Sequence, residues 1–335
     1  MKVIKYWRAG LLGVIASLLA VYFIASQMKD VGLMWSALRS ADYGWVLVSM
    51  GVIVAGLFAR GARWRALLGG SLPFARAFSI TNVSYLVNGV LPLRIGELAR
   101  AYLAAQVRPP VPVMKAVGTI VVERLIDVLA VLIILALALA AGPLPEELHA
   151  AALFFAPVVI VGFALLLLLA SQRERTLRLA ERFTKPIAFF QRRDWLAWLR
   201  QFLEGLSPLT QPSALVQVLA LSAVSWACSL LSGYVLMIAF YGYGDWATTC
   251  LFSAAASLAV AVPAVPGNLG TYEASILLAL GAMGFGEPAA TAVAFAIAVH
   301  AVNLLVNSAL GVYGFIQEGV SLDQLSQGVR EMKTG

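Results

Sequence analysis

Two clusters of charged side chains lie within otherwise apolar stretches of this sequence. The first is Arg94, Glu97 and Arg100, and the second is Glu123, Arg124 and Asp127. An Arg, Lys or Asp at the centre of a membrane helix costs about 2.5–3.5 kcal/mol on insertion scales, so such residues usually face a polar interior. The two clusters therefore predict polar chemistry inside an apolar protein.

The spacing within the clusters predicts local ion pairs. Glu97 and Arg100 are three residues apart, and so are Arg124 and Asp127, which places each pair on one face of a helix. An ion-pair network that holds a hairpin against the next helix is one interpretation. The other is an anion site, because arginine forms two parallel charge-assisted hydrogen bonds with phosphate. In that site the carboxylates orient the arginines or carry a proton.

A third candidate group is Asn268, Tyr272 and Glu273. The preceding Pro266–Gly270 stretch breaks a helix, and backbone donors at a helix start favour an anion or a polar headgroup. The alternative is that Glu273 only caps the new helix. In the last apolar run, His300 is expected to be a packing residue rather than a proton carrier.

One further group of residues, Arg60, Arg63 and Trp64, follows an apolar run and is expected to lie at the membrane interface.

Composition predicts an all-α integral membrane protein. Of 335 residues, 61% are hydrophobic and 12% charged, with a mean hydropathy of +0.87. Soluble domains average about 45–50% apolar and about 25% charged residues. This excludes a soluble enzyme and a nucleic-acid-binding protein. No Walker loop or His-Glu-x-x-His motif occurs, so the sequence predicts no catalytic residues, cofactor or metal site.

About six apolar runs have roughly the 17–25 residues that cross a bilayer. They are Ala9–Ser26, Tyr43–Ala59, Ala116–Gly142, Ala150–Ser171, Ala214–Tyr241 and Ala289–Ile316. Residues 78–105 and 247–283 are interrupted by proline and glycine, which break helices. Broken backbone at membrane depth must be buried in protein or line a cavity, so both segments are interpreted as re-entrant helical hairpins, with kinked full spans as the alternative.

Charge placement predicts two inverted halves, residues 1–142 and 143–318, with a tail at 319–335. Lys and Arg gather before the first run, after the second and in Gln172–Gln211, so the positive-inside rule places these loops and both termini in the cytoplasm of a bacterial-type inner membrane. Residues 172–211 also carry aromatic side chains and are interpreted as an amphipathic cytoplasmic segment, with a solvated linker as the alternative. Halves of equal order and opposite orientation are typical of secondary transporters.

Four blocks carry a family resemblance: Arg60–Trp64, Asn88–Arg100, Val122–Asp127 and Pro263–Glu273. In this order they resemble the lysylphosphatidylglycerol synthase transmembrane, or flippase, family. In two-part members this membrane region precedes a soluble aminoacyl-tRNA-dependent transferase and is assigned the movement of the modified lipid between leaflets. Only Gln317–Gly335 follow the last run, so the resemblance implies a stand-alone member that lacks the transferase domain.

The function predicted at this stage is a lipid flippase for an anionic or amphipathic lipid, with membrane lipids as partners. Arg94, Arg100 and Arg124 would engage the headgroup, and the acidic residues would organise the site or couple it to protons. One alternative is a membrane-embedded lipid-modifying transferase with Glu97, Glu123 or Asp127 as general base. Another is an accessory subunit of a lipid-biosynthesis enzyme. The sequence also leaves open whether the protein forms homo-oligomers.

Overall fold

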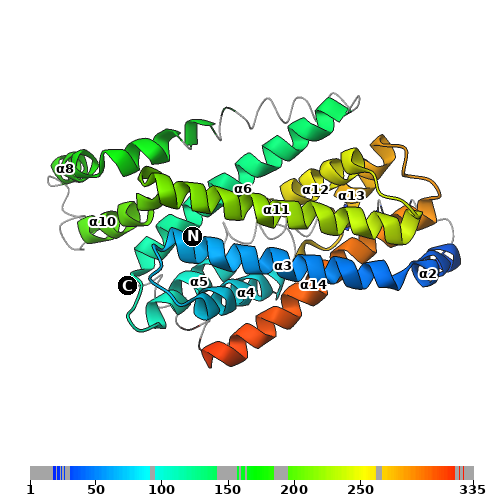
Figure 1. Ribbon diagram of the computed structural model, residues 1–335, viewed down its shortest axis with the longest axis horizontal. Helices are drawn as coiled ribbons and strands as arrows, with labels where there is room; N and C mark the ends of the chain where they lie inside the picture. Colours follow the sequence, from blue (N-terminus) through cyan, green and yellow to red (C-terminus); the bar gives the residue numbers. More distant parts are fainter. Residues whose placement is uncertain are drawn as a thin grey trace.

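All regular secondary structure in the described part of the chain is helical. The computed structural model describes residues 31–90, 95–141, 164–184, 195–261 and 266–320, and isolated positions between 18 and 26, between 157 and 162, and at 324 and 327. Within these residues no strand occurs, as Figure 1 shows. The predicted all-α membrane architecture is therefore confirmed at this level.

The elements of the first part of the chain are α2 (Val31–Ser40), α3 (Tyr43–Leu67), α4 (Phe74–Val90), α5 (Ile95–Gln106) and α6 (Val113–Ala141). Those of the second part are α8 (Arg173–Thr184), α10 (Trp195–Gly205), η2 (Ser207–Thr210), α11 (Pro212–Tyr241), α12 (Trp246–Ala261), η3 (Pro266–Asn268), α13 (Thr271–Ala282) and α14 (Ala289–Glu318). A long helix, two short helices separated by a break, and another long helix thus occur in this order twice.

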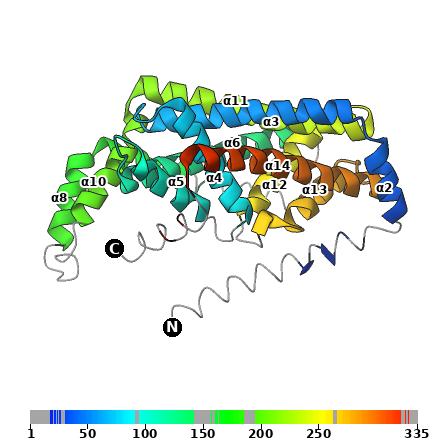
Figure 2. The ribbon, with the colours of Figure 1, turned by 90° about the horizontal axis from the view of Figure 1, so that it is seen from below.

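Helices α3 and α11 form the long axis of the molecule and run side by side in both Figure 1 and Figure 2. They are antiparallel, because Ser49 of α3 donates to the carbonyl of Ser232 while Arg63, further along α3, donates to Ser222. Gly56 allows the close approach: a Cβ there would lie 3.1 Å from the Cβ of Cys228. The two central helices are therefore packed nearly backbone to backbone.

The predicted breaks at proline and glycine occur in both short-helix pairs. Between α4 and α5, residues 91–94 lie outside the described chain, and the Gly96 amide beyond them donates to Asn88 Oδ1 at 2.8 Å. A side chain at Gly96 would clash with the carbonyl of Ser84. Between α12 and α13, Gly270 has a φ of 86°, which glycine adopts without strain. Glycine thus permits the tight return in each pair.

The end of α4 lies against the break of the second short-helix pair. η3 packs against α4, and a Cβ on Gly267 would lie 3.5 Å from the Gly89 carbonyl. Elsewhere α4 packs along α14, and α12 packs along α6. Each short-helix pair is therefore held by the last long helix of the other half.

The segment predicted as one amphipathic stretch, residues 172–211, contains α8, α10 and η2. These helices lie at one end of the molecule in both views. α10 packs on α6 through Gly118 and Gly205, which bring the two backbones close together. The α10 part of this segment thus packs against α6, the helix that carries Glu123. The location of residues 172–211 at the lipid headgroups stays a prediction.

Three described helices, α3, α11 and α14, are long and apolar enough to cross a membrane. α6 has 29 residues and carries the second charged cluster. Helix α3 continues to Leu67, eight residues beyond the predicted end at Ala59, so Arg60 and Arg63 lie within it. The predicted run Ala9–Ser26 lies largely outside the described residues, and part of the run Ala150–Ser171 lies outside them too.

Candidate functional site

A buried ion-pair network joins α3, α5 and α6. Glu123 accepts hydrogen bonds from Arg100 Nη1 at 3.1 Å on Oε1 and from Arg100 Nη2 at 2.7 Å on Oε2, and Arg63 Nη2 lies 3.1 Å from the same Oε1. The Glu123 and Arg63 side chains are 0% exposed, and Arg100 is 1% exposed. Buried charges are tolerated only when they are paired and hydrogen-bonded, and this carboxylate meets both conditions.

Arg63 links that carboxylate to a second one. Its Nη1 donates to Asp127 Oδ1 at 2.6 Å and its Nη2 to Oδ2 at 3.2 Å, while Nη1 also reaches Ser222 Oγ at 3.2 Å. The planar guanidinium therefore bridges α3, α6 and α11. The Arg63 guanidinium fixes the positions of these three helices relative to one another, because each of its hydrogen bonds depends on direction as well as distance.

Trp64 covers the other side of the network. The Arg100 guanidinium lies 4.0 Å from the Trp64 ring centroid, and the indole Nε1 donates to Thr119 Oγ1 at 3.2 Å. Trp64 has no exposed surface. The prediction that Arg63 and Trp64 lie at the membrane interface is therefore wrong. Helix α3 does not end where its apolar run ends, and the continuing helix directs both side chains into the protein.

At the edge of the network, Arg124 is partly exposed and contacts several carboxylates. Its Nε lies 3.1 Å from Glu97 Oε1, and its terminal nitrogens lie 3.7 Å from Asp127 and 3.8 Å from Glu123. The predicted proximity of Arg124 and Asp127 is thus found. The predicted pairing of Glu97 with Arg100 is wrong, because Arg100 is bonded to Glu123 on α6 and Glu97 contacts Arg124 instead.

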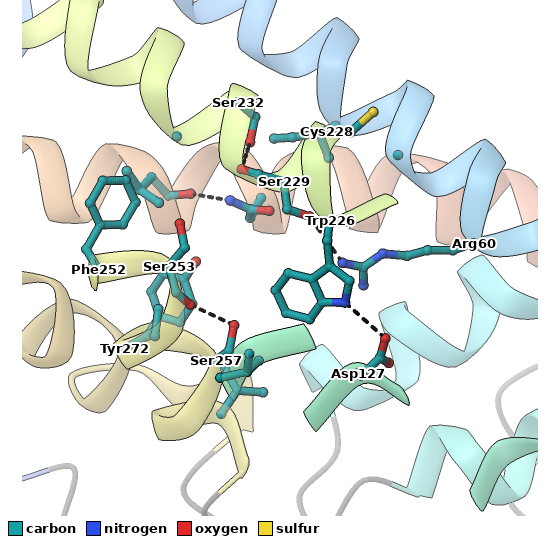
Figure 3. Close-up of a pocket in the computed structure, with 18 of the residues that line it drawn as sticks. Arg60, Asp127, Trp226, Cys228, Ser229, Ser232, Phe252, Ser253, Ser257 and Tyr272 are labelled. Atoms are coloured by element: carbon teal, nitrogen blue, oxygen red, sulfur yellow. Dashed lines mark hydrogen bonds between the residues drawn. The ribbon is translucent and has the colours of Figure 1, made fainter. Parts of the chain in front are cut away.

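A cavity of about 280 Å³ adjoins the network, between α3, α6, α11, α12, α13 and α14. Figure 3 shows Arg60, Trp226 and Asp127 together on one side and Phe252, Ser253 and Tyr272 on the other. Serine hydroxyls and the amides of Asn303 and Asn307 also line it. Its walls further include the apolar residues Ile53, Leu57, Val128, Val131, Leu236, Leu258, Val260 and Val299. The cavity is therefore charged at one side and mixed polar and apolar elsewhere.

Arg60 is the cavity residue with the least compensated charge. It donates to Tyr85 Oη at 3.4 Å and to Ser229 Oγ at 3.3 Å, and its guanidinium lies 5.7 Å from the Tyr85 ring centroid and 6.0 Å from that of Trp226. Trp226 in turn donates its Nε1 hydrogen to Asp127 at 3.3 Å. Among the ion pairs of the described residues, none joins Arg60 to a carboxylate within 4.0 Å.

Counted over the described residues, the site holds one more positive than negative charge. The cationic side chains are Arg60, Arg63, Arg100 and Arg124, and the anionic ones are Glu97, Glu123 and Asp127. The excess belongs to Arg60, because the other guanidinium groups contact carboxylates. A single anionic group in the cavity would balance the site.

A second ionisable pair lies near the break of the second short-helix pair. Glu273 Oε1 is 2.6 Å from His300 Nδ1, and Glu273 Oε2 accepts from the Gly270 amide at 2.8 Å. The Tyr272 ring lies 4.5 Å from the His300 ring and lines the cavity. Glu273 caps α13 as the alternative predicted, and it also binds His300. His300 is buried and has a hydrogen-bond partner, as expected of a packing residue, and that partner is the carboxyl group of Glu273.

The family model for the lysylphosphatidylglycerol synthase TM region matches residues 10–311. The chain belongs to this family. No curated protein and no solved structure matches it. Membership in this lipid-related family, together with three long apolar helices, identifies a membrane-embedded protein that contacts membrane lipids.

Within this family member, most of the predicted site residues form two groups. The network gathers Glu97, Arg100, Glu123, Arg124 and Asp127. Tyr272 and Glu273 belong to the second group. Asn268 belongs to neither: its φ is 54°, its carbonyl accepts from Thr271, and it does not line the cavity. Arg94 lies outside the described residues.

Several residues of the site were not predicted as site residues, among them Arg60, Arg63 and Trp226. The spacing of the two arginines held a usable signal, because positions three apart share one face of a helix. Extending the second apolar run by two turns would have placed both inside the bundle. Trp226 gave no such signal, because a tryptophan within an apolar run is typical of any membrane helix.

Proposed function

We propose that this protein moves an anionic or amphipathic lipid between the leaflets of a bacterial-type inner membrane. The observation that carries the proposal is the cavity beside the ion-pair network, with Arg60 and Arg124 in its wall. A phosphate-bearing headgroup is the membrane component whose charge and hydrogen-bonding geometry match a guanidinium.

The charge balance supports an anionic headgroup. Arg60 contacts hydroxyl groups and aromatic rings but no carboxylate among the described ion pairs, so its charge is available to a ligand. Asp127, by contrast, is already held by Arg63 and Trp226. The network thus fixes the walls of the cavity while one cation is left for the substrate.

The size and lining of the cavity support a headgroup rather than a whole lipid. Its volume of about 280 Å³ lies near the lower end of the roughly 300–1,000 Å³ range of small-molecule sites. Ser229, Ser253 and Asn303 offer hydrogen bonds, and Leu236 and Val299 offer apolar contact. The acyl chains would extend away from the cavity toward the membrane.

The topology that we propose has about six spans and two re-entrant hairpins in inverted halves, with both termini in the cytoplasm. The repeated helix order, the antiparallel α3 and α11, and the meeting of η3 with α4 support it. Transporters built from inverted repeats place their sites where broken helices meet near the midplane. The cavity is lined by residues of α12 and α13, the helices on either side of the second break, which supports this placement.

Transport fits the contacts better than group transfer does. A general base must reach the proton of an acceptor group. Glu97, Glu123 and Asp127, the candidate bases, each contact at least one guanidinium group. We therefore propose a transporter without catalytic residues, and the lipid-modifying transferase becomes the less favoured function.

A leaflet-exchange assay tests the proposal. The full chain is reconstituted into phosphatidylcholine vesicles that contain a trace of NBD-labelled phosphatidylglycerol, and dithionite is added outside to quench exposed probe. We expect the wild type to expose inner-leaflet probe and Arg60→Gln to slow this exposure. Arg76→Gln is the matched control, because Arg76 is 46% exposed and binds Glu318 away from the cavity. Wild-type vesicles that behave like protein-free vesicles would refute the proposal.

A further inference from the structure

The Glu273 and His300 pair is a buried ionisable site separate from the arginine network. Their side chains are 10% and 7% exposed, and Oε1 and Nδ1 are 2.6 Å apart. A carboxylate oxygen only accepts, and a ring nitrogen that lacks hydrogen only accepts as well. A contact this short therefore requires a proton between the two atoms. The pair is built to hold at least one proton within the protein.

The pair connects three parts of the transport machinery proposed above. Glu273 lies on α13 and binds the Gly270 amide at the break of the second short-helix pair. His300 lies on α14, which packs along α4 of the other pair. The Tyr272 ring lies 4.5 Å from the His300 ring at a tilt of 32°, and Tyr272 also lines the cavity. The pair thus contacts both the break of the second short-helix pair and a residue of the cavity wall.

The surroundings leave the pair electrically isolated. Among the described residues, no ion pair gives Glu273 or His300 another charged partner, and Tyr272 is the titratable group in ring contact with His300. The other titratable groups on the elements packed against α13 and α14 are Arg39 on α2; Tyr43, Arg60, Arg63 and Arg65 on α3; Arg76 and Tyr85 on α4; Cys228, Tyr234 and Tyr241 on α11; Cys250 on α12; and Tyr313 and Glu318 on α14 itself. Figure 3 shows Arg60 on the side of the cavity opposite Tyr272. An added proton is therefore not offset by a neighbouring ion pair.

We infer that Glu273 and His300 form a proton-binding site that couples lipid movement to a pH difference across the membrane. With a neutral His300 that donates from Nδ1 to the Glu273 carboxylate, the pair carries one negative charge, and one proton taken from water makes it neutral overall, as a carboxylate beside an imidazolium. A second proton, taken from water, leaves a neutral carboxyl group beside an imidazolium, and the pair gains one positive charge. A neutral carboxyl accepts the Gly270 amide less strongly than a carboxylate does, so the hairpin break loosens. The coupling to lipid movement rests on the proposed function, whereas the proton site does not.

The proton site is tested first, in the full chain and without a lipid substrate. The sequence contains two histidines, His149 and His300, so NMR of protein labelled with ¹⁵N-histidine gives two ring systems, and His149→Gln assigns them. We expect the His300 ring signals to titrate with pH, and Glu273→Gln to move that titration while the His149 signals keep theirs. His300 signals that do not change with pH, or that Glu273→Gln leaves unchanged, would overturn the proton site.

The coupling is tested in phosphatidylcholine vesicles with NBD-labelled phosphatidylglycerol under an imposed pH gradient of either sign. We expect the wild-type exchange rates with and without the gradient to differ, and their ratio to fall to one in Glu273→Gln and His300→Gln. His149→Gln is expected to keep the wild-type ratio. A wild-type ratio of one, or variants that keep the wild-type response, would overturn the coupling.

The two experiments separate the two ideas. Should the wild type move no probe at all, the proposed function fails, while the NMR titration still decides whether the proton site exists.

Discussion

Replacing Glu123 with glutamine tests how much the buried ion-pair network of α3, α5 and α6 stabilises the fold. Glu123→Gln keeps the shape of the side chain but removes the negative charge that faces Arg63 and Arg100. Arg63 retains Asp127, whereas Arg100 loses the carboxylate to which it is bonded. Breaking a buried ion pair on one side costs about 3–5 kcal/mol, because the remaining charge is buried without compensation. Since Arg100 and Glu123 are at most 1% exposed, we expect the loss in unfolding free energy to fall in that range.

The assay is reversible unfolding of the full chain in mixed micelles with increasing SDS, followed by tryptophan fluorescence. Glu97→Gln is the matched control, because Glu97 and its partner Arg124 are 24% and 33% exposed and Arg124 keeps two further carboxylates nearby. We expect the control to lose about 1 kcal/mol or less, as partly exposed pairs do.

A double variant, Arg100→Met with Glu123→Leu, distinguishes a lost charge pair from lost packing. Replacing a buried pair by apolar residues of similar volume is often neutral. The double variant should therefore recover most of the stability that Glu123→Gln loses. A single variant that loses no more than Glu97→Gln would refute the reasoning.

Three other substitutions are checked by the same unfolding measurement. Gly96→Ala should lower the unfolding free energy by about 1–3 kcal/mol, because the new Cβ overlaps the Ser84 carbonyl. Gly51→Ala is its control and should be tolerated, because nothing lies within 4 Å of a Cβ there. Equal effects of the two substitutions would contradict this. Trp64→Phe should cost about 1–3 kcal/mol by leaving Thr119 without its indole donor, and an unchanged midpoint would count against that bond. Arg60→Gln should leave stability near wild type, because its contacts are neutral hydroxyls and rings; a large loss would show that Arg60 supports the fold.

The sequence predicted the features that depend on local chemistry. Its apolar composition predicted a helical membrane protein, and the proline and glycine positions predicted breaks near Gly96 and Gly270, where the structure has them. The spacing of Arg124 and Asp127 predicted their proximity, because three residues along a helix bring side chains together.

The contacts between helices could not be predicted in the same way. Glu97 lies three residues before Arg100, yet Arg100 binds Glu123 on another helix. A charged hydrogen bond is electrostatically stronger at this buried position than near the surface. The sequence predicts an interfacial position for Arg63 because the apolar run Tyr43–Ala59 ends just before Arg60. Its partners Asp127 and Ser222 lie far along the chain, and only tertiary packing brings them to it.

The proposed function is the movement of an anionic lipid across the bilayer by way of the cavity in which Arg60 has no carboxylate partner among the described ion pairs. Its most direct test is the exchange rate of NBD-labelled phosphatidylglycerol in vesicles with equal amounts of wild type, Arg60→Gln or Arg76→Gln. We expect rapid exchange for the wild type and Arg76→Gln and slow exchange for Arg60→Gln, with all three proteins equally stable. Equal exchange rates for the wild type and Arg60→Gln would contradict it.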